Sequence, residues 1–266
     1  MNDPLKLTIL LPVRNEGINV RIMLKILGAV VEVPHEVLVV VDSPDDETIP
    51  TVRDLQPDYA NLRLIENTLG RGVINAIRAG VAEAHGDNIL IFAADEVGPV
   101  LAIHDMLSLI EDGCDFVSCT RYAHGGRRLG GSFIGGLLSQ TANRIFYQVS
   151  GCAFTDATTG IKMFRRAVFD MLEIEANPVG WAVAFEMSIK AQLKGLTLGE
   201  VPIISIDRLY GGESTFKLGP WVREYLRWFI WGVRHLRRDP AAAKSQVRIP
   251  TPTSLIGMGN NPLHKE

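Results

Sequence analysis

The feature that most limits the fold of this chain is a short apolar run that stops abruptly on two acids. The six residues from Ile89 to Ala94 carry no charge, and Asp95 and Glu96 follow them directly. A continuous apolar run of strand length is typical of a strand buried on both faces, as in a parallel sheet. Chemistry in open α/β sheets collects at the carboxyl ends of such strands. The two carboxylates are therefore expected either to hold a divalent cation or simply to cap the next helix.

The first 120 residues alternate between strand and helix patterns. This alternation predicts an α/β fold with a doubly wound parallel sheet whose loops gather along one edge. The first, second and fourth strands end in acids, which suit a ribose, a base or a bridging metal. Neither a G-x-G-x-x-G after the first strand nor a P-loop motif occurs, which argues against dinucleotide and P-loop chemistry. Strands are expected at 7–13, 36–41, 62–66, 88–94 and 116–119, and helices at 18–31, 72–84 and 100–111.

The second half of the chain places cations and acids around glycine-rich loops. Arg127 and Arg128 lie in one such loop, where guanidinium groups suit phosphate; a solvated loop with scattered charge is the alternative. Asp156 precedes a short strand, and Glu186 lies in a mostly apolar helix, where a buried acid needs a partner or a function. Helices are expected at 133–149 and 181–193, strands at 161–164 and 200–206, and a second glycine-rich loop at 209–217.

A helix expected at 220–238 is rich in aromatic residues on one side and arginine on the other. Such a composition is typical of a helix on a membrane surface, although docking on the core or on a second copy of the chain is the alternative. The chain after 240 lacks periodicity, so we predict a main domain at 1–217, this helix at 218–239 and a mobile tail at 240–266. The residues in question are Trp221, Tyr225, Trp228, Phe229 and Trp231, and Arg223, Arg227, Arg234 and Arg238.

Composition narrows the class of protein further. The net charge of −3 gives no reason to expect nucleic-acid binding. Cys114, Cys119 and Cys152 show no metal-ligand spacing and leave an odd thiol in any disulfide scheme, which suits a reducing compartment. The first residues do not resemble a signal peptide, and no apolar run reaches the ~18–20 residues that cross a bilayer. We expect a cytoplasmic protein, either soluble or peripheral on the inner face of a membrane.

Several short motifs occur together in an order typical of one family. Pro12-Val-Arg-Asn15-Glu16 resembles the P-x-x-N-E opening of family 2 glycosyltransferases, and the turn from Asp42 to Thr48 resembles their D-x-S-x-D-x-T segment. The later blocks are similar to those of the dolichyl-phosphate mannose synthase branch. The resemblance covers about residues 7 to 217 and also includes Gly70-Arg-Gly72 through Gly80, Thr120-Arg121-Tyr122, Asp156 to Gly160 with Lys162 and Phe164, Glu200-Val-Pro202-Ile203, and Arg208 with Gly212 to Lys217.

This resemblance implies a GT-A fold with a mixed, mainly parallel sheet flanked by helices, a nucleotide-sugar donor and inversion at the anomeric carbon. It assigns Asp95 to the second acid of the family's D-x-D metal motif. It also assigns the phosphates of donor or acceptor to Arg121 with Arg127 or Arg128. The residues expected around the nucleotide sugar are Pro12, Asn15, Glu16, Asp42 and Gly72, with Arg208, Ser214 and Lys217 closing over the pyrophosphate.

The sequence departs from the family pattern at the expected cation site. Ala93 takes the place of the first D-x-D acid, and Val97 takes the place of a downstream polar ligand. Glu96 is then the remaining candidate beside Asp95. Mg²⁺ commonly uses few carboxylates together with substrate phosphates, so we still expect Mg²⁺ or Mn²⁺ to bind with help from the donor diphosphate.

The acceptor decides which catalytic groups the chain needs. A lipid phosphate is already an anion and needs no general base, and the branch usually acts on polyprenyl phosphates at a membrane. A soluble or protein hydroxyl would need a base, for which Asp156 and Glu186 are the candidates. We expect the polyprenyl phosphate. The alternatives are a hydroxyl acceptor, or a protein that binds a nucleotide sugar without turning it over because of Ala93.

Overall fold

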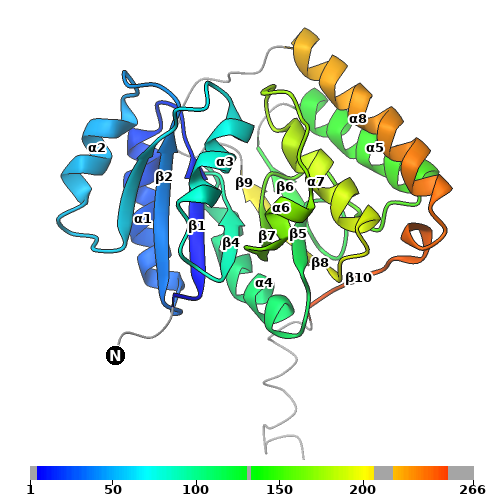
Figure 1. The fold of residues 1–266 in the computed structure, drawn as a ribbon, viewed down its shortest axis with the longest axis horizontal. Helices are drawn as coiled ribbons and strands as arrows, with labels where there is room; N and C mark the ends of the chain where they lie inside the picture. Colours follow the sequence, from blue (N-terminus) through cyan, green and yellow to red (C-terminus); the bar gives the residue numbers. More distant parts are fainter. Residues whose placement is uncertain (1–4, 131–132, 207–217, 251–266) are drawn as a thin grey trace, which may run out of the picture.

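The computed structural model describes residues 5–130, 133–206 and 218–250, and its centre is a mixed sheet. The strands lie in the order β10-β8-β5-β7-β4-β1-β2-β3 (Figure 1). Every neighbouring pair is parallel except those that β7 forms with β4 and β5. The strands are β1 (Leu7–Pro12), β2 (His35–Val41), β3 (Leu62–Glu66), β4 (Asn88–Ile91), β5 (Phe116–Thr120), β7 (Lys162–Arg165), β8 (Leu198–Pro202) and β10 (Val247–Arg248).

Side chains alternate across this sheet and supply a core to each of its faces. Leu7, Ile9 and Leu11 of β1 point into one core cluster, whereas Leu10 belongs to the other. This period of two is the one that a strand imposes on its side chains. The first cluster is covered by α1 (Gly17–Val30), α2 (Thr48–Leu55), η1 (Gly98–Leu101) and α4 (Ala102–Glu111), and the second by α3 (Val73–Ala82), α6 (Val168–Met171) and α7 (Ala182–Leu193).

The antiparallel strand β7 brings its preceding loop to the same edge as the carboxyl ends of its neighbours. The carboxyl ends of β1, β2, β4 and β5 share one edge because these strands run in parallel. Since β7 runs the other way, its amino end lies at that edge. The predicted α/β class and the expected mixed, mainly parallel sheet are confirmed. The residues at 155–159 join the loops that follow the parallel strands.

A further layer of two helices lies outside α7. Residues 182–192 of α7 are all buried, because α5 (Phe133–Ser150) and α8 (Leu218–Arg238) pack beyond them, side by side at the outer end of the molecule (Figure 1). Trp228 is fully buried, and Tyr225, Phe229 and Trp231 pack against the core. The aromatic side of α8 thus docks within the chain, which is one of the alternatives that the sequence left open.

The chain after 240 differs in part from the predicted tail. A short turn, η2 (Ala242–Lys244), leads into β10, which adds to the sheet beside β8. Gln192 Nε2 donates to Ala242 O at 2.7 Å, and Arg248 Nη1 donates to Asp112 O. A two-residue strand is too short to show a periodic pattern, so the sequence gives no sign of it. Residues 251–266 lie outside the described part of the chain.

The outward surface of α5 and α8 is apolar and basic, and we call it the α5–α8 face. Its leucines are well exposed, with 63% of Leu138 and 53% of Leu226 accessible. The two helices contain a single acid, Glu224, which is buried. Among the described residues, no helix combines the length and hydrophobicity needed to span a bilayer. The face comprises Leu137, Leu138, Ile145, Tyr147, Val149, Val222, Leu226 and Ile230, with Arg144, Arg223, Arg227, Arg234, Arg237 and Arg238.

The close approach of α3 to the sheet gives a test of the fold. A Cβ at Gly80 would lie 2.1 Å from Leu10 Cδ1 and 3.2 Å from Val40 Cγ2. Gly80→Ala should lower the free energy of unfolding by about 1–3 kcal/mol through overpacking, although alanine favours helices. Gly28→Ala in α1 is the control, because its Cβ would meet no described atom within 4 Å, and it should stabilise by about 0.5–1 kcal/mol. Urea denaturation measures both; equal stabilisation by the two variants would contradict the close approach.

Candidate functional site

The loops after β1 and β2 are joined by one buried carboxylate, Asp46. The backbone N–H of Asn15 donates to both Asp46 oxygens at 3.1 and 3.2 Å, and the Thr48 N–H donates to Asp46 Oδ1 at 2.8 Å at the start of α2. Asn15 has a φ of 55°, a left-handed conformation that asparagine tolerates better than most residues. Glu47 N donates in return to Asn15 Oδ1 at 3.2 Å. Asp46 thereby fixes the segment that carries Pro12, Asn15 and Glu16.

Asp42 directly follows β2, and only one of its two carboxylate oxygens has a hydrogen-bond partner among the described residues. Gly72 N donates to Asp42 Oδ2 at 2.8 Å, whereas Oδ1 is buried and has no hydrogen-bond partner among the described residues. A buried acceptor without a partner is costly, and a ligand N–H or O–H would satisfy it. Gly72 has a φ of 116°, and a Cβ there would lie 2.7 Å from Pro178 Cβ, so only glycine fits.

Asp95 and Glu96 lie half-buried in the turn that follows β4, which ends at Ile91 and not at residue 94 as predicted. Ser205 Oγ, from β9 (Ile204–Ile206), donates to Glu96 Oε2 at 3.2 Å. No group of three or more His, Cys, Asp or Glu residues that could hold a metal ion occurs in the described part of the chain. Two carboxylates are fewer ligands than a divalent cation takes, so a cation held here would need its remaining ligands from substrate phosphates.

Arg121 and Asp156, predicted separately, form one buried ion pair. Arg121 Nε donates to Asp156 Oδ2 at 2.7 Å and Nη2 donates to Oδ1 at 3.0 Å, while the Arg121 N–H adds a bond at 3.2 Å. Burial alone would raise the pKa of Asp156, but the charge and hydrogen bonds of Arg121 lower it below its usual value. Asp156 is therefore an ionised anchor for the guanidinium and a weak candidate for a base.

Glu200 of β8 accepts hydrogen bonds from the loop at 155–159, which carries Asp156. Its Oε1 accepts the N–H groups of Thr155 at 2.8 Å and of Asp156 at 3.3 Å, and Thr155 Oγ1 donates to Oε2 at 2.8 Å. Burial raises the pKa of Glu200 to about 7, against the lowering effect of these hydrogen bonds. His124 Nε2 lies 3.8 Å from Oε2. The loop is thus fixed through its backbone.

Glu186 is engaged on both of its oxygens. Glu175 N donates to Oε1 at 2.6 Å, Ala176 N donates to Oε2 at 2.7 Å, and Lys190 Nζ lies 2.8 Å from Oε1. Glu186 is fully buried, and burial raises its pKa against the lowering effect of Lys190. Its role as a base stays a prediction, and these contacts favour a structural role in which it fixes the turn before α7.

The remaining predicted residues lie around this edge or beyond the described chain. Arg127 is exposed and Arg128 half-buried on β6 (Arg127–Leu129), which pairs with β9 in a small second sheet. The Nη1 of Arg128 lies 3.5 Å from where a Cβ of Gly136 would stand, so this arginine reaches the first turn of α5. Arg208, Ser214 and Lys217 lie outside the described residues.

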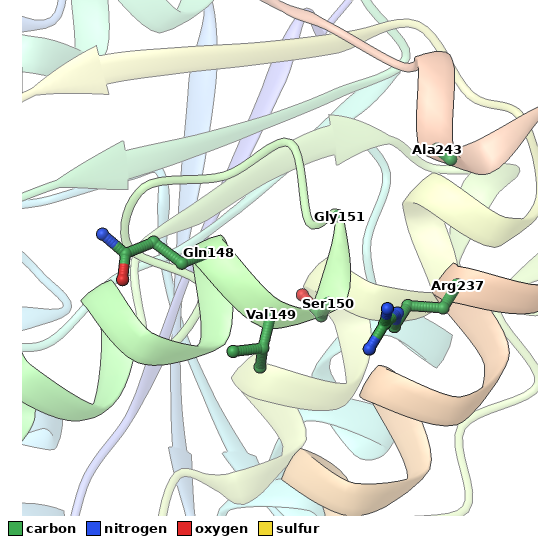
Figure 2. A pocket seen from close by; sticks show the side chains of 6 residues that line it. All are labelled: Gln148, Val149, Ser150, Gly151, Arg237 and Ala243. Atoms are coloured by element: carbon green, nitrogen blue, oxygen red, sulfur yellow. The ribbon is translucent and has the colours of Figure 1, made fainter.

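Two surface hollows lie apart from these residues. One, of about 500 Å³, lies where the ends of α5 and α8 meet, and Figure 2 shows Arg237 beside Ser150 there. The other, of about 610 Å³, is lined by Arg78 and Arg166 among others. None of the predicted site residues lines either hollow.

Sequence reasoning missed three residues that organise the site. Asp46 entered it only within the turn from Asp42 to Thr48, without the hydrogen bond that the Asn15 N–H donates to its carboxylate. It gave no role to Asn143 or Glu200, each of which bonds the backbone of the 155–159 loop. The signal for Asn143 is a polar residue three positions before Phe146, on the side of the helix that packs inward.

Known proteins match both the sequence and the fold. A model of the family described as glycosyl transferase family 2 matches residues 8–172. A dolichol-phosphate mannosyltransferase of Pyrococcus furiosus is 28% identical over 230 residues, which cover 84% of this chain and 62% of that protein. A protein of the same name from Mycosarcoma maydis is 26% identical over 188 residues, 67% of this chain and 60% of that one. The chain spans about three fifths of the length of these curated relatives.

Among solved structures, glucosyl-3-phosphoglycerate synthase from Mycobacterium tuberculosis superposes with a TM-score of 0.64. That structure is a complex with Mn²⁺, uridine diphosphate and glucosyl-3-phosphoglycerate, and another of the same enzyme contains Mg²⁺ and uridine diphosphate. The sequences are 15% identical over 86% of this chain and 80% of that one. The likeness confirms the GT-A fold.

The raised pKa of Glu200 predicts a pH dependence of stability. The folded protein keeps this proton up to about pH 7, whereas the unfolded side chain loses it near 4.5. The folded state binds more protons between these values, so the free energy of unfolding should fall as the pH rises, by roughly 3 kcal/mol in all. Glu200→Gln should flatten this slope in urea denaturation between pH 5 and 8, and the exposed Glu111→Gln should keep it. An unchanged slope in Glu200→Gln would rule out this assignment.

Proposed function

Because this chain belongs to glycosyl transferase family 2, we propose that it is an inverting glycosyltransferase that moves a sugar from a nucleotide-diphosphate sugar to a polyprenyl phosphate. The observation that carries this proposal is the buried Arg121–Asp156 pair at the functional edge of the sheet. It presents a fixed cation suited to an anionic acceptor. Both candidate bases are engaged, Asp156 by Arg121 and Glu186 by two N–H groups and Lys190.

The donor nucleotide would lie over the ends of β1 and β2. Asp42 Oδ1 is a buried hydrogen-bond acceptor without a partner among the described residues. A nucleoside carries N–H and O–H donors on its base and ribose that could satisfy it. The clamp of Asp46 on Asn15 holds the neighbouring loop in place. Pro12, Glu16 and Gly72 line the same region by their place in the chain.

The transfer itself follows from charge. An oxygen of the lipid phosphate attacks the anomeric carbon and forms a new C–O bond, while the bond from that carbon to the diphosphate oxygen breaks. No proton moves, because the attacking oxygen is already anionic. Arg121 orients the acceptor phosphate, and Arg127 or Arg128 adds positive charge on the side of α5.

A divalent cation would be held by Asp95 and Glu96 together with phosphate oxygens of the donor. It would neutralise the charge that grows on the leaving diphosphate. Ala93 contributes no ligand, so we expect weaker cation binding than a site with a third carboxylate would give.

The α5–α8 face would bring the enzyme to its lipid substrate. Its exposed aliphatic side chains can enter the interfacial layer of a bilayer, and its arginines complement anionic headgroups. The single acid of the two helices is buried, so no exposed carboxylate of these helices would oppose such binding. The relatives named above as dolichol-phosphate mannosyltransferases support a lipid phosphate as the acceptor.

Donor binding tests the proposed function. Calorimetric titration with UDP-sugars and GDP-sugars in Mn²⁺ should give a Kd for one of them, and Asp42→Asn should weaken it about 10–100-fold, because a charge-assisted hydrogen bond is lost. Asp45→Asn is the control, since Asp45 is exposed in the same turn. Loss of binding in EDTA would support the cation site. Absence of binding to every donor would overturn the function itself, and binding without transfer would favour a nucleotide-sugar-binding protein.

Membrane association is tested by vesicle flotation. The protein should float with vesicles of 30 mol% phosphatidylserine but not with purely zwitterionic vesicles, and rising salt should weaken the binding. Leu226→Glu with Ile230→Glu should reduce the bound fraction about tenfold or more. Leu101→Glu is the control, because Leu101 is 75% exposed on η1, which packs with α1. If the control loses as much binding as the double variant, the α5–α8 face is not the docking surface.

A further inference from the structure

The inward side of α5 approaches the loop that carries Asp156. Among the described residues of this helix, Asn143, Phe146 and Ser150 are buried, at the spacing of one helical face. Phe146 packs in the aromatic core against Phe185 and Phe229. Asn143 is different, because an amide with only 3% of its surface exposed must find polar partners.

Each polar atom of the Asn143 side chain is matched to a partner. Oδ1 accepts the Ala157 N–H at 3.0 Å, while Nδ2 donates to Thr158 Oγ1 at 2.8 Å and to Ser139 O at 3.0 Å. One acceptor and two donors are used, which is the set that a primary amide offers in this geometry. The orientation of the amide is unambiguous, because the Ala157 N–H can bond only the amide oxygen and the Ser139 carbonyl can bond only the amide nitrogen.

These contacts continue directly to the ion pair. Thr158 Oγ1 donates to Asp156 Oδ1 at 3.1 Å and accepts from Arg121 Nη2 at 3.2 Å. The Thr158 N–H also donates to Asp156 Oδ1, at 3.3 Å. Asn143 therefore holds Thr158, and Thr158 touches both members of the pair.

The other supports of this loop act at different points. Glu200 bonds the N–H groups of Thr155 and Asp156, and the Ser188 hydroxyl donates to Ala157 O at 2.8 Å while accepting from Lys162 Nζ at the same distance. Asn143 is the described side chain that bonds both the Ala157 N–H and the Thr158 hydroxyl.

We propose that Asn143 is a positioning residue for the transfer reaction, which sets the Arg121 guanidinium at the acceptor phosphate through Thr158 and Asp156. The inference rests on the proposed function for the identity of the acceptor, and on the hydrogen bonds alone for the link itself. Asn143 touches neither the reacting atoms nor the donor end of the sheet, so its loss changes the rate of transfer and leaves donor binding intact.

The isosteric variant Asn143→Asp isolates the two donated hydrogen bonds. Its carboxylate accepts the Ala157 N–H but cannot donate to Thr158 or Ser139, so we expect kcat to fall about 10–100-fold with donor KM unchanged. A protonated carboxyl group regains one donor. The ratio of variant to wild-type kcat should therefore rise as the pH falls. The other charged groups near this loop do not affect the ratio, because both proteins contain them: Arg121, Asp156, Glu200 and Lys162.

Ser150→Ala is the matched control. Ser150 is fully buried on the same helix, its hydroxyl donates to Phe146 O, and it accepts the Cys152 N–H, which lies outside the loop. It should lower thermal stability as a lost buried hydrogen bond does, yet leave kcat unchanged. Amide hydrogen exchange should be faster at 155–159 in Asn143→Asp only.

The outcomes separate this inference from the proposed function. Faster exchange at 155–159 with lower kcat and unchanged donor KM supports the inference. Unchanged exchange, unchanged kcat or an equal loss of kcat in Ser150→Ala overturns it. A wild-type protein that transfers no sugar overturns the proposed function, and the exchange measurement then decides alone whether Asn143 holds the loop.

Discussion

The bidentate ion pair between Arg121 and Asp156 is the interaction on which the functional edge depends. Asp156 is fully buried and Arg121 nearly so, with 15% of its side chain exposed. Burying either charge alone would be strongly unfavourable, and breaking a buried pair by removing one partner typically costs about 3–5 kcal/mol. The loop at 155–159 and the end of β5 must therefore stay together. A guanidinium held in this way can meet a phosphate without reorganising, which is the condition for electrostatic catalysis.

The topology makes this pair possible. If β7 ran parallel to its neighbours, the loop before it would lie at the edge of the sheet opposite to the carboxyl end of β5. The single reversed strand β7 brings its leading loop to the end of β5, and the buried groups around it then fix the loop. The outer helices take part in the same arrangement, because α5 supplies Asn143 while α8 covers α7 with its aromatic side. The hydrogen bonds of Asn143 thus join α5, which carries part of the α5–α8 face, to the loop at 155–159.

Much of the fold could be predicted from the sequence. Apolar strands that alternate with segments of helical spacing predicted the α/β class and the shared edge. The local pattern could not give the direction of β7, since four residues look the same in either direction. Nor could it show β10, a two-residue strand held by the edge of β8.

The site could be predicted in part. Three acids follow parallel strands, namely Asp42, Asp95 and Glu96. Because the carboxyl ends of parallel strands share one edge of the sheet, the sequence places these acids at that edge. The pairing of Arg121 with Asp156 joins residues 35 positions apart, and no local signal reports it. Asn143 and Glu200 were missed for the same reason, because a buried polar residue shows its role only through partners distant in sequence. The sequence suggested Glu186 as a base from its apolar surroundings, without the two backbone N–H groups and the lysine that occupy it.

The proposed role of this edge is to bind an anionic acceptor, with neither Asp156 nor Glu186 acting as a general base. Its most direct test is to offer the protein the same short polyprenyl chain as a phosphate and as a free alcohol, with a saturating labelled nucleotide sugar. The label extracted into the organic phase then measures transfer to each. We expect the phosphate to take the sugar and the alcohol to take none above background. Transfer to the alcohol at a comparable rate would contradict it, since that reaction requires a base which Asp156, as Arg121 holds it, does not provide.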